Sequence, residues 1–250
     1  YAAFGLQCML DLSVDSLGAG DIVVIAPEFS SQMYSDFVGY EYLLQACEGR
    51  LDMIGVLGTD YWSGLLAKLP GHIGAKRNIA ATGELKPTGV YALPSFDEYG
   101  DIVYERTSNI MDGMVSEANL PEISAEIVTD SFADMINEYA STAQKRGASV
   151  YFGFCPVNEK AVEIAQGIDT EGFLDALDAK LDIPVIASLD DHIMDAGYFY
   201  DSNFHMNDAG AIYNTILLVN DIKRVNGNMS QTETAIPKPP AGDSEGDILS

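Results

Sequence analysis

The stretch that decides the fold is Asp21-Ile22-Val23-Val24-Ile25-Ala26-Pro27-Glu28. Four β-branched residues stand in an unbroken apolar run, which Gly20-Asp21 opens and Pro27 closes. An apolar run without polar alternation is typical of a strand that is buried on both faces of a parallel sheet. The segment therefore predicts a buried parallel strand.

Further strands and helices alternate along the rest of the chain. Residues 148–154 and 183–188 predict two more strands, because both are short apolar runs bounded by Gly or Pro. Apolar residues at helical spacing predict helices over residues 1–12, 40–47, 61–69, 124–146, 159–181 and 207–224, with a break at Gly167. This order predicts the α/β class, as a three-layer αβα sandwich with a parallel, flavodoxin-like sheet.

One segment departs from this alternation. Two short β-prone runs, residues 88–93 and 102–106, flank the turn sequence Asp97-Glu98-Tyr99-Gly100-Asp101. This pattern favours a small β-hairpin near residues 88–106, as an excursion from the main sheet.

The chain is expected to hold one domain and a tail. Residues 1–224 contain all the predicted elements, whereas residues 225–250 carry three prolines and few large apolar residues. We expect residues 225–250 to form a flexible linker or tail. The sequence opens at Tyr1 in what resembles the middle of an element, which suggests a fragment or a processed form.

Composition excludes several function classes. The chain has 13 Lys+Arg and 38 Asp+Glu, so its net charge is 13 − 38 = −25, yet 47% of its residues are hydrophobic, as in globular proteins. Such a charge opposes binding to nucleic acids and to anionic membranes. No apolar run approaches about 18 residues, so we expect no membrane insertion by this segment. A sugar, or a neutral or cationic small molecule, remains a possible substrate.

The three cysteines are predicted to be buried thiols. Cys8, Cys47 and Cys155 are widely spaced and odd in number, which is not the pattern of a disulfide framework or of a metal knuckle. One disulfide remains open as an alternative.

The densest group of chemically active side chains lies at residues 189–210, between the third predicted strand and the last helix. Within it, Asp201 precedes His205 by four residues. An Asp at this position can accept a hydrogen bond from one imidazole N–H, which leaves the other ring nitrogen free to act as a general base. The alternative is that these polar residues only cap the last helix, with Asn207 or Asp208 at the N-cap.

Glu28 is a further candidate functional residue, and the acidic segment also raises the question of a metal site. Glu28 follows the first predicted strand, where its carboxylate would either bind a substrate hydroxyl or hold a loop. The acidic and histidine residues of 189–210 also offer metal ligands, but neither an HExxH nor an EF-hand pattern occurs. We expect no metal and no cofactor.

Three segments together resemble the SGNH (GDSL-type) hydrolase superfamily, and in particular bacterial SGNH-like proteins. These are Gly20-Asp21-Ile22-Val23-Val24-Ile25-Ala26-Pro27-Glu28-Phe29, the strand and Pro156-Val157-Asn158 after it, and Phe199-Tyr200-Asp201-Ser202-Asn203-Phe204-His205-Met206-Asn207. The resemblance covers residues 1–224. It implies a Ser-His-Asp mechanism with His205 and Asp201 as catalytic residues, and we expect Glu28, Asn158 and Asn203 to bind substrate.

The chain also departs from the pattern of that superfamily. The first strand, with the nucleophilic serine, should precede Tyr1, and Asp201 and His205 are spaced by four residues where three is usual. The resemblance implies an esterase or an O-acyl (acetyl) transferase acting on acylated carbohydrate, in an extracytoplasmic or cell-surface location of a bacterium. The alternative is a non-catalytic SGNH-fold module that binds carbohydrate or a protein partner.

Overall fold

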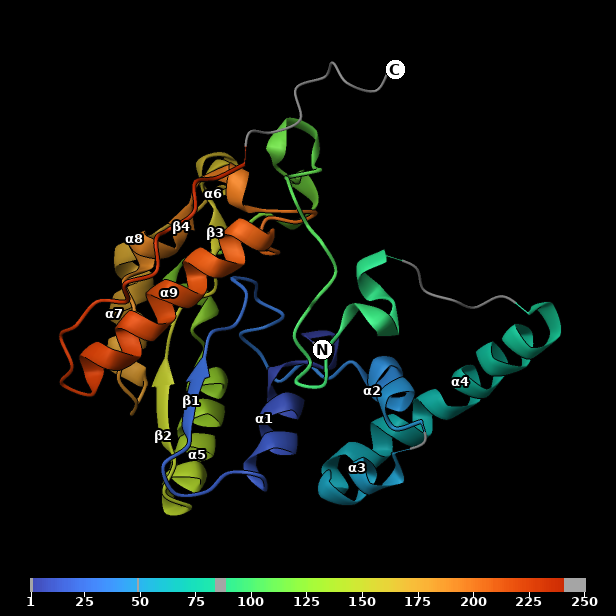
Figure 1. The fold of residues 1–250 in the computed structure, drawn as a ribbon. Coiled ribbons are helices and arrows are strands. Elements are labelled where there is room, and N and C mark those ends of the chain that lie inside the picture. The colour runs from blue at the N-terminus through green and yellow to red at the C-terminus, as the bar shows by residue number, and fades with distance from the viewer. Residues whose placement is uncertain (1, 49, 84–88, 241–250) are drawn as a thin grey trace, which may run out of the picture. The chain divides into compact units, whose positions relative to one another are not determined.

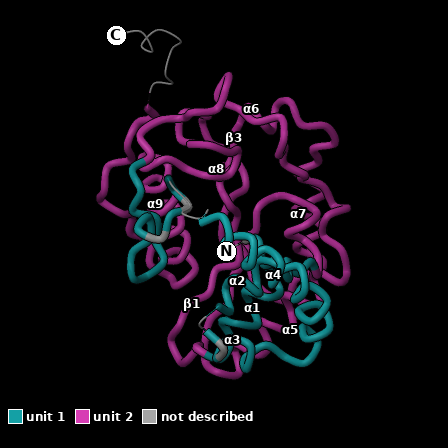
Figure 2. The backbone as a smooth tube through the Cα atoms, turned by 90° about the vertical axis from the view of Figure 1, so that its right-hand side faces the viewer, with its two compact units in different colours: residues 1–15, 37–105 teal, residues 16–36, 106–250 magenta. Residues whose placement is uncertain are grey.

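The computed structural model describes residues 2–48, 50–83 and 89–240, and shows a mixed α/β protein with small parallel sheets (Figure 1). The described residues fall into two compact units (Figure 2). Unit 1 comprises residues 1–15 and 37–105, and unit 2 comprises residues 16–36 and 106–250. The sequence did not predict this division of the expected domain of residues 1–224.

The main parallel pair of unit 2 forms where the two most apolar runs lie. Strand β1 (Ile22–Ile25) pairs in parallel with β2 (Ser149–Phe152), in a register that sets Ile25 opposite Phe152. The two strands expected there are thus confirmed as a parallel pair. The third expected strand is reduced to one parallel bridge between Val185 and Phe152. Pro184 has no N–H to donate, which limits the ladder at this point.

A second, very short parallel pair follows. Strand β3 (Val157–Asn158) pairs with β4 (Ile193–Met194). Neither was predicted, because two-residue strands carry too little apolar pattern to be recognised.

The expected long helices of unit 2 are present with shifted ends. Thr129 caps α5, since its hydroxyl accepts from the N–H of Phe132 at 3.1 Å, so the helix begins later than residue 124. The helix expected over 159–181 is divided around Gly167, whose φ of 73° is left-handed. The helices of unit 2 are α5 (Asp130–Lys145), α6 (Glu159–Ile164), α7 (Thr170–Lys180), α8 (Leu189–His192) and α9 (Asp208–Val225).

Helices cover both faces of the β1–β2 pair. Phe132 of α5 packs edge-to-face on Phe152 of β2, with ring centroids 6.3 Å apart. Successive residues of a strand point to opposite faces of the sheet. Ile25 is paired with Phe152, so Val24 faces the side opposite to α5, where it lines a cavity together with Leu218 of α9. Aromatic side chains dominate the core of unit 2: Phe29, Tyr34, Phe132, Phe152 and Phe173 are all buried.

Unit 1 is helical. Its core gathers Phe4, Cys8, Leu43, Tyr61 and Leu65. Its helices are α1 (Leu6–Val14), α2 (Tyr40–Ala46), α3 (Leu51–Val56) and α4 (Trp62–Thr82). The last was predicted to end near Leu69, but it continues through Pro70 to Thr82, where Gly83 with a φ of 69° forms the C-cap.

The prediction of a β-hairpin near residues 88–106 is largely wrong. Short 3-10 helices, Gly89–Tyr91 and Leu93–Ser95, replace its first strand, and Thr88 lies outside the described residues. Among the described residues of this segment, only Phe96 and Ile102 pair, in an antiparallel bridge. Gly89 has a φ of 69°, and Pro94 cannot donate to a ladder, so both disfavour a strand here.

The tail expected after residue 224 is described as far as Pro240. Tyr198 donates a hydrogen bond to the carbonyl of Pro237 at 2.8 Å, and the N–H of Thr232 donates to Asn220 Oδ1 at 2.8 Å. These hydrogen bonds join the tail to the 3-10 helix η8 (Ala196–Tyr198) and to α9, whereas the sequence suggested a flexible tail. Among the described residues, no helix is both long enough and apolar enough to cross a membrane.

Candidate active site

The loop between η8 (Ala196–Tyr198) and α9 folds back on itself. Phe199 and Met206 form an antiparallel bridge, and the N–H of Tyr200 donates to the carbonyl of His205 at 2.8 Å. Asn207 then caps α9, since its Oδ1 accepts from the N–H of Gly210 at 3.0 Å. The loop is therefore fixed at both ends, and it carries Asp201 and His205 between them.

The structure brings Asp201 and His205 together. Asp201 Oδ1 lies 2.8 Å from His205 Nδ1, with the two side chains 23% and 46% exposed. A carboxylate can only accept, so this contact assigns the proton of the neutral imidazole to Nδ1. The lone pair is then on Nε2, which leaves His205 ready to take a proton from a hydroxyl.

Glu28 stands on the other side of the same imidazole. Its Oε1 is 4.0 Å from His205 Nε2, which is longer than a hydrogen bond. Pro27 and Glu28 follow β1, so the end of that strand places this carboxylate beside His205. The backbone carbonyl of Glu28 accepts from Ser30 N at 2.8 Å, and this turn holds the position of the residue.

Asn203 and Asn158, both expected to bind substrate, are fully buried. Asn203 exchanges hydrogen bonds with the backbone of Ser116, donating from Nδ2 at 2.7 Å and accepting at Oδ1 at 3.0 Å. Asn158 donates to the carbonyl of Met114 at 2.7 Å, and its Oδ1 accepts from Lys160 N. These contacts hold residues 114–116 against the site. Direct substrate binding by either asparagine stays a prediction.

The serines closest in sequence to these residues are engaged in turns. Ser30 Oγ accepts from the N–H of Met33 at 3.3 Å, and Ser31 Oγ donates to Glu122 at 3.2 Å. Ser202 Oγ accepts from the N–H of His205 at 3.2 Å. The contacts of Ser30 and Ser202 are local ones of the kind usual in turns, whereas Ser31 contacts a residue far along the chain.

Cys155, which follows β2, is not activated as a nucleophile. Burial, and then the nearby charge of Glu28, raise the pKa of this thiol well above its usual value. The thiolate is the nucleophilic form, so Cys155 stays an inert thiol near neutral pH.

Two other acidic residues of the segment 189–210, Asp195 and Asp208, have structural contacts. Asp195 Oδ1 accepts from Gly197 N at 2.7 Å, and Asp208 Oδ2 accepts from Arg106 N at 3.0 Å. Within the part of the chain that the structure describes, no three His, Cys, Asp or Glu side chains are grouped so as to hold a metal ion.

The other two histidines have contacts of their own. His72 Nε2 is 2.8 Å from Glu48 Oε1 in unit 1. His192 is 3% exposed in unit 2, and its Nδ1 is 2.9 Å from the carbonyl of Ser188. His192 lines a cavity that the sequence did not predict, since its walls come from five separate segments of unit 2.

In comparisons with known proteins, no family model, no curated protein and no solved structure matches this chain.

Proposed function

We propose that this chain carries the acid–base half of an SGNH-type ester hydrolase or O-acyl transferase. The observation that carries the proposal is the contact of 2.8 Å between Asp201 Oδ1 and His205 Nδ1, which leaves Nε2 as the base. The proposed substrate is an acylated carbohydrate, reached in an extracytoplasmic or cell-surface location of a bacterium. These two points rest on the sequence resemblance.

The edge of β1 supports a place for the nucleophile. The N–H groups of Ser149 and Gly153 donate to the carbonyls of Asp21, just before β1, and of Ile25, so the backbone groups of these two residues face β2. By alternation, the backbone groups of Ile22 and Val24 face the opposite edge, and β1 has β2 as its single neighbour among the described strands. Ile22 is 45% exposed there.

We place the first strand of the proposed fold on this edge. A strand that runs parallel to β1 would end at the same side of the sheet as Glu28, which lies 4.0 Å from His205. A serine at the end of that strand would therefore come close to His205 Nε2. With it, the β1–β2 pair and the helices on both faces would extend to the expected three-layer, flavodoxin-like sandwich.

The chemistry follows from the tautomer. As the serine oxygen attacks the ester carbonyl carbon, Nε2 takes the hydroxyl proton and the carbonyl electrons move to oxygen. Collapse of the tetrahedral intermediate breaks the bond to the leaving oxygen, which takes the proton from Nε2. Water, or an acceptor hydroxyl, then repeats the sequence on the acyl-enzyme. Asp201 keeps its hydrogen bond to Nδ1 throughout and so stabilises the imidazolium.

The second candidate is a non-catalytic SGNH-fold module that binds carbohydrate or a protein partner. It is favoured by the hydrogen bonds of Ser30, Ser31 and Ser202, which engage all three hydroxyls in structural contacts. An exposed Glu28–His205–Asp201 group would then bind hydroxyls rather than activate them.

A covalent probe separates the two candidates. The protein is produced with the residues encoded before Tyr1 and treated with a fluorophosphonate, and the labelled residue is found by peptide mass spectrometry. The proposal expects one labelled serine before Tyr1, with labelling lost in His205→Ala and kept in the control His72→Ala. Absence of any labelled serine in the folded protein favours the binding module.

A further inference from the structure

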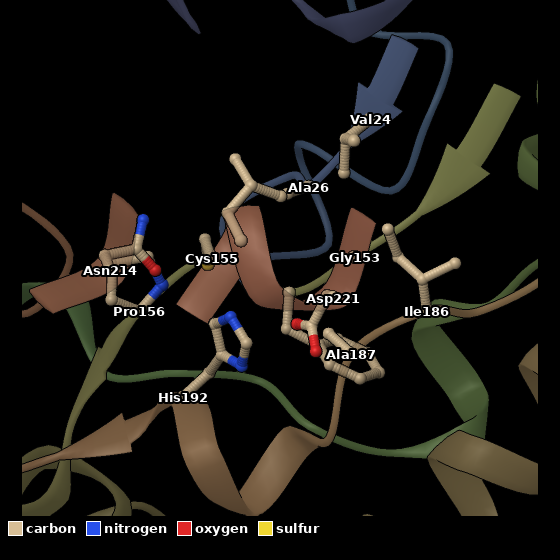
Figure 3. Close-up of a pocket in the computed structure, with 12 residues that line it drawn as sticks. Val24, Ala26, Gly153, Cys155, Pro156, Ile186, Ala187, His192, Asn214 and Asp221 are labelled. Carbon is tan, nitrogen blue, oxygen red and sulfur yellow. The ribbon is translucent and has the colours of Figure 1, made fainter. Parts of the chain in front are cut away.

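Unit 2 contains a cavity of about 190 Å³ between the sheet and α9, shown in Figure 3. Its walls are mainly apolar, and its lining comes from β1, the residues after β2, residues 186–187, α8 and α9. A cavity of about 150 Å³ in another protein is large enough to hold benzene, so this one can accept a ring-sized molecule. The apolar wall residues include Val24, Phe154, Ile186 and Leu218.

A buried histidine marks one side of the cavity. His192 is 3% exposed, and its Nδ1 lies 2.9 Å from the carbonyl of Ser188. A carbonyl only accepts, so Nδ1 carries the proton of the neutral ring and Nε2 is an acceptor. In Figure 3 the ring of His192 lies between Asn214 and Asp221, which both come from α9.

Two further hydrogen-bond acceptors, Asn214 and Asp221, complete the polar part of the cavity lining. Asn214 Oδ1 is buried and has no hydrogen-bond partner among the described residues, although buried polar atoms are nearly always paired. Asp221 is 7% exposed and pairs with Arg224 Nη2 at 2.7 Å. Arg224 also donates to the carbonyl of Ile186 at 2.6 Å, which fixes this pair at the wall.

The chemistry of a matching ligand follows from these groups. The carboxylate of Asp221 is already paired with the guanidinium of Arg224 at 2.7 Å, so the lining holds no unpaired carboxylate for a cation. It offers acceptors at His192 Nε2 and Asn214 Oδ1 beside apolar walls. A ligand must therefore donate a hydrogen bond and have an apolar body.

We propose that this cavity is a second small-molecule site, distinct from the Asp201–His205 pair, which binds a neutral alcohol with a small cyclic or branched apolar body. The hydroxyl donates to Asn214 Oδ1 or His192 Nε2, and the body packs on Val24, Phe154 and Leu218. The site goes beyond the proposed esterase or acyl-transferase function and does not depend on it.

Two probes of equal size test the donor requirement. Cyclohexanol donates a hydrogen bond, whereas cyclohexanone only accepts. Binding of each to the 250-residue chain is measured by ligand-observed NMR titration. We expect cyclohexanol to bind about five- to tenfold more tightly than cyclohexanone, as the loss of one buried hydrogen bond implies. Equal affinities would overturn the polar part of the site, and no binding of either probe would overturn the site altogether.

Variants locate the binding. Asn214→Ala should weaken cyclohexanol binding about five- to tenfold, and Leu218→Phe should abolish it by filling the cavity. Asn226→Ala, at the exposed end of α9, is the matched control and should leave binding unchanged. Circular dichroism confirms folding, and if Leu218→Phe does not fold, Val24→Leu replaces it. Binding that survives both Asn214→Ala and the filling variant would contradict this location.

Discussion

Asp201 Oδ1 accepts a hydrogen bond from His205 Nδ1 at 2.8 Å, across a loop that the Phe199–Met206 bridge closes. The spacing of four residues is accommodated because the loop turns between the two positions, so both side chains reach the same side. The Nε2 atom is left facing Glu28 Oε1, 4.0 Å away. Every catalytic role proposed for this chain depends on this arrangement.

The tautomer of His205 can be observed directly. We expect a long-range ¹H–¹⁵N spectrum of the folded chain to show the proton on Nδ1 whenever His205 is neutral, because Asp201 accepts from that atom. Asp201→Asn offers an amide that can also donate, so the variant should show a mixture of tautomers. A dominant Nε2–H form in the unsubstituted chain would contradict the assigned roles of the two nitrogens.

The cysteines should be unreactive in the folded chain. Burial raises the pKa of Cys8 to about 12 and also raises the pKa values of Cys47 and Cys155, so little thiolate exists at pH 8. We expect iodoacetamide to label none of the three within an hour at pH 8, and all three in concentrated urea, as read by intact-mass spectrometry. Rapid labelling of the folded chain would show that these thiols are accessible.

Asp221 should make stability depend on pH in an unusual direction. Burial raises the pKa of this carboxyl above 3.8, against the opposing charges of Arg224 and His192. The folded state therefore binds the proton more tightly than the unfolded state, so this contribution to stability is complete below pH 3.8 and is lost as the pH rises through the folded pKa.

The measurement that checks this compares urea unfolding of the unsubstituted chain and of Asp221→Asn at pH values from below 3.8 to neutral. The free energy of unfolding of the variant should rise relative to that of the unsubstituted chain as the pH increases above 3.8, and then level off. A constant difference at all pH values would mean that Asp221 has the same pKa in both states.

The edge of β1 should favour association between chains. Ile22 is 45% exposed on a strand whose outer backbone groups face away from β2, and such edges pair with other strands. We expect Ile22→Lys to reduce aggregation of the 250-residue chain in light scattering, with Ile212→Lys, on exposed α9 surface, as the control. Equal aggregation of the two variants would argue against the edge as the contact.

The sequence predicted best what depends on long apolar patterns. The run Ile22–Ile25 and its partner Ser149–Phe152 formed the expected parallel pair. Helices α5 and α7 formed within the expected ranges, and α9 ends one residue beyond its expected range. The hairpin failed because Gly89 and Pro94 set the backbone locally more strongly than β propensity does. Strands β3 and β4 have two residues each, which is too short to show an apolar pattern in the sequence.

The candidate site was predictable only in part. Asp201 and His205 are close in sequence and end up in contact, whereas the approach of Glu28 depends on how β1 ends, far away along the chain. The cavity around His192 and Asn214 could not be predicted, because its walls meet only after folding. Asn158 and Asn203 carry motif positions, but their backbone contacts appear only in three dimensions.

The most direct test of the central claim is turnover of p-nitrophenyl acetate by the protein that includes the residues encoded before Tyr1. We predict that His205→Ala lowers kcat by about 10⁶-fold and Asp201→Asn by about 10⁴-fold, since the base is lost in the first variant and only its orientation in the second. His72→Ala should stay within a few-fold of the unsubstituted protein, with folding checked by circular dichroism. A folded His205→Ala variant that turns over ester at the unsubstituted rate would contradict the claim that His205 is the catalytic base.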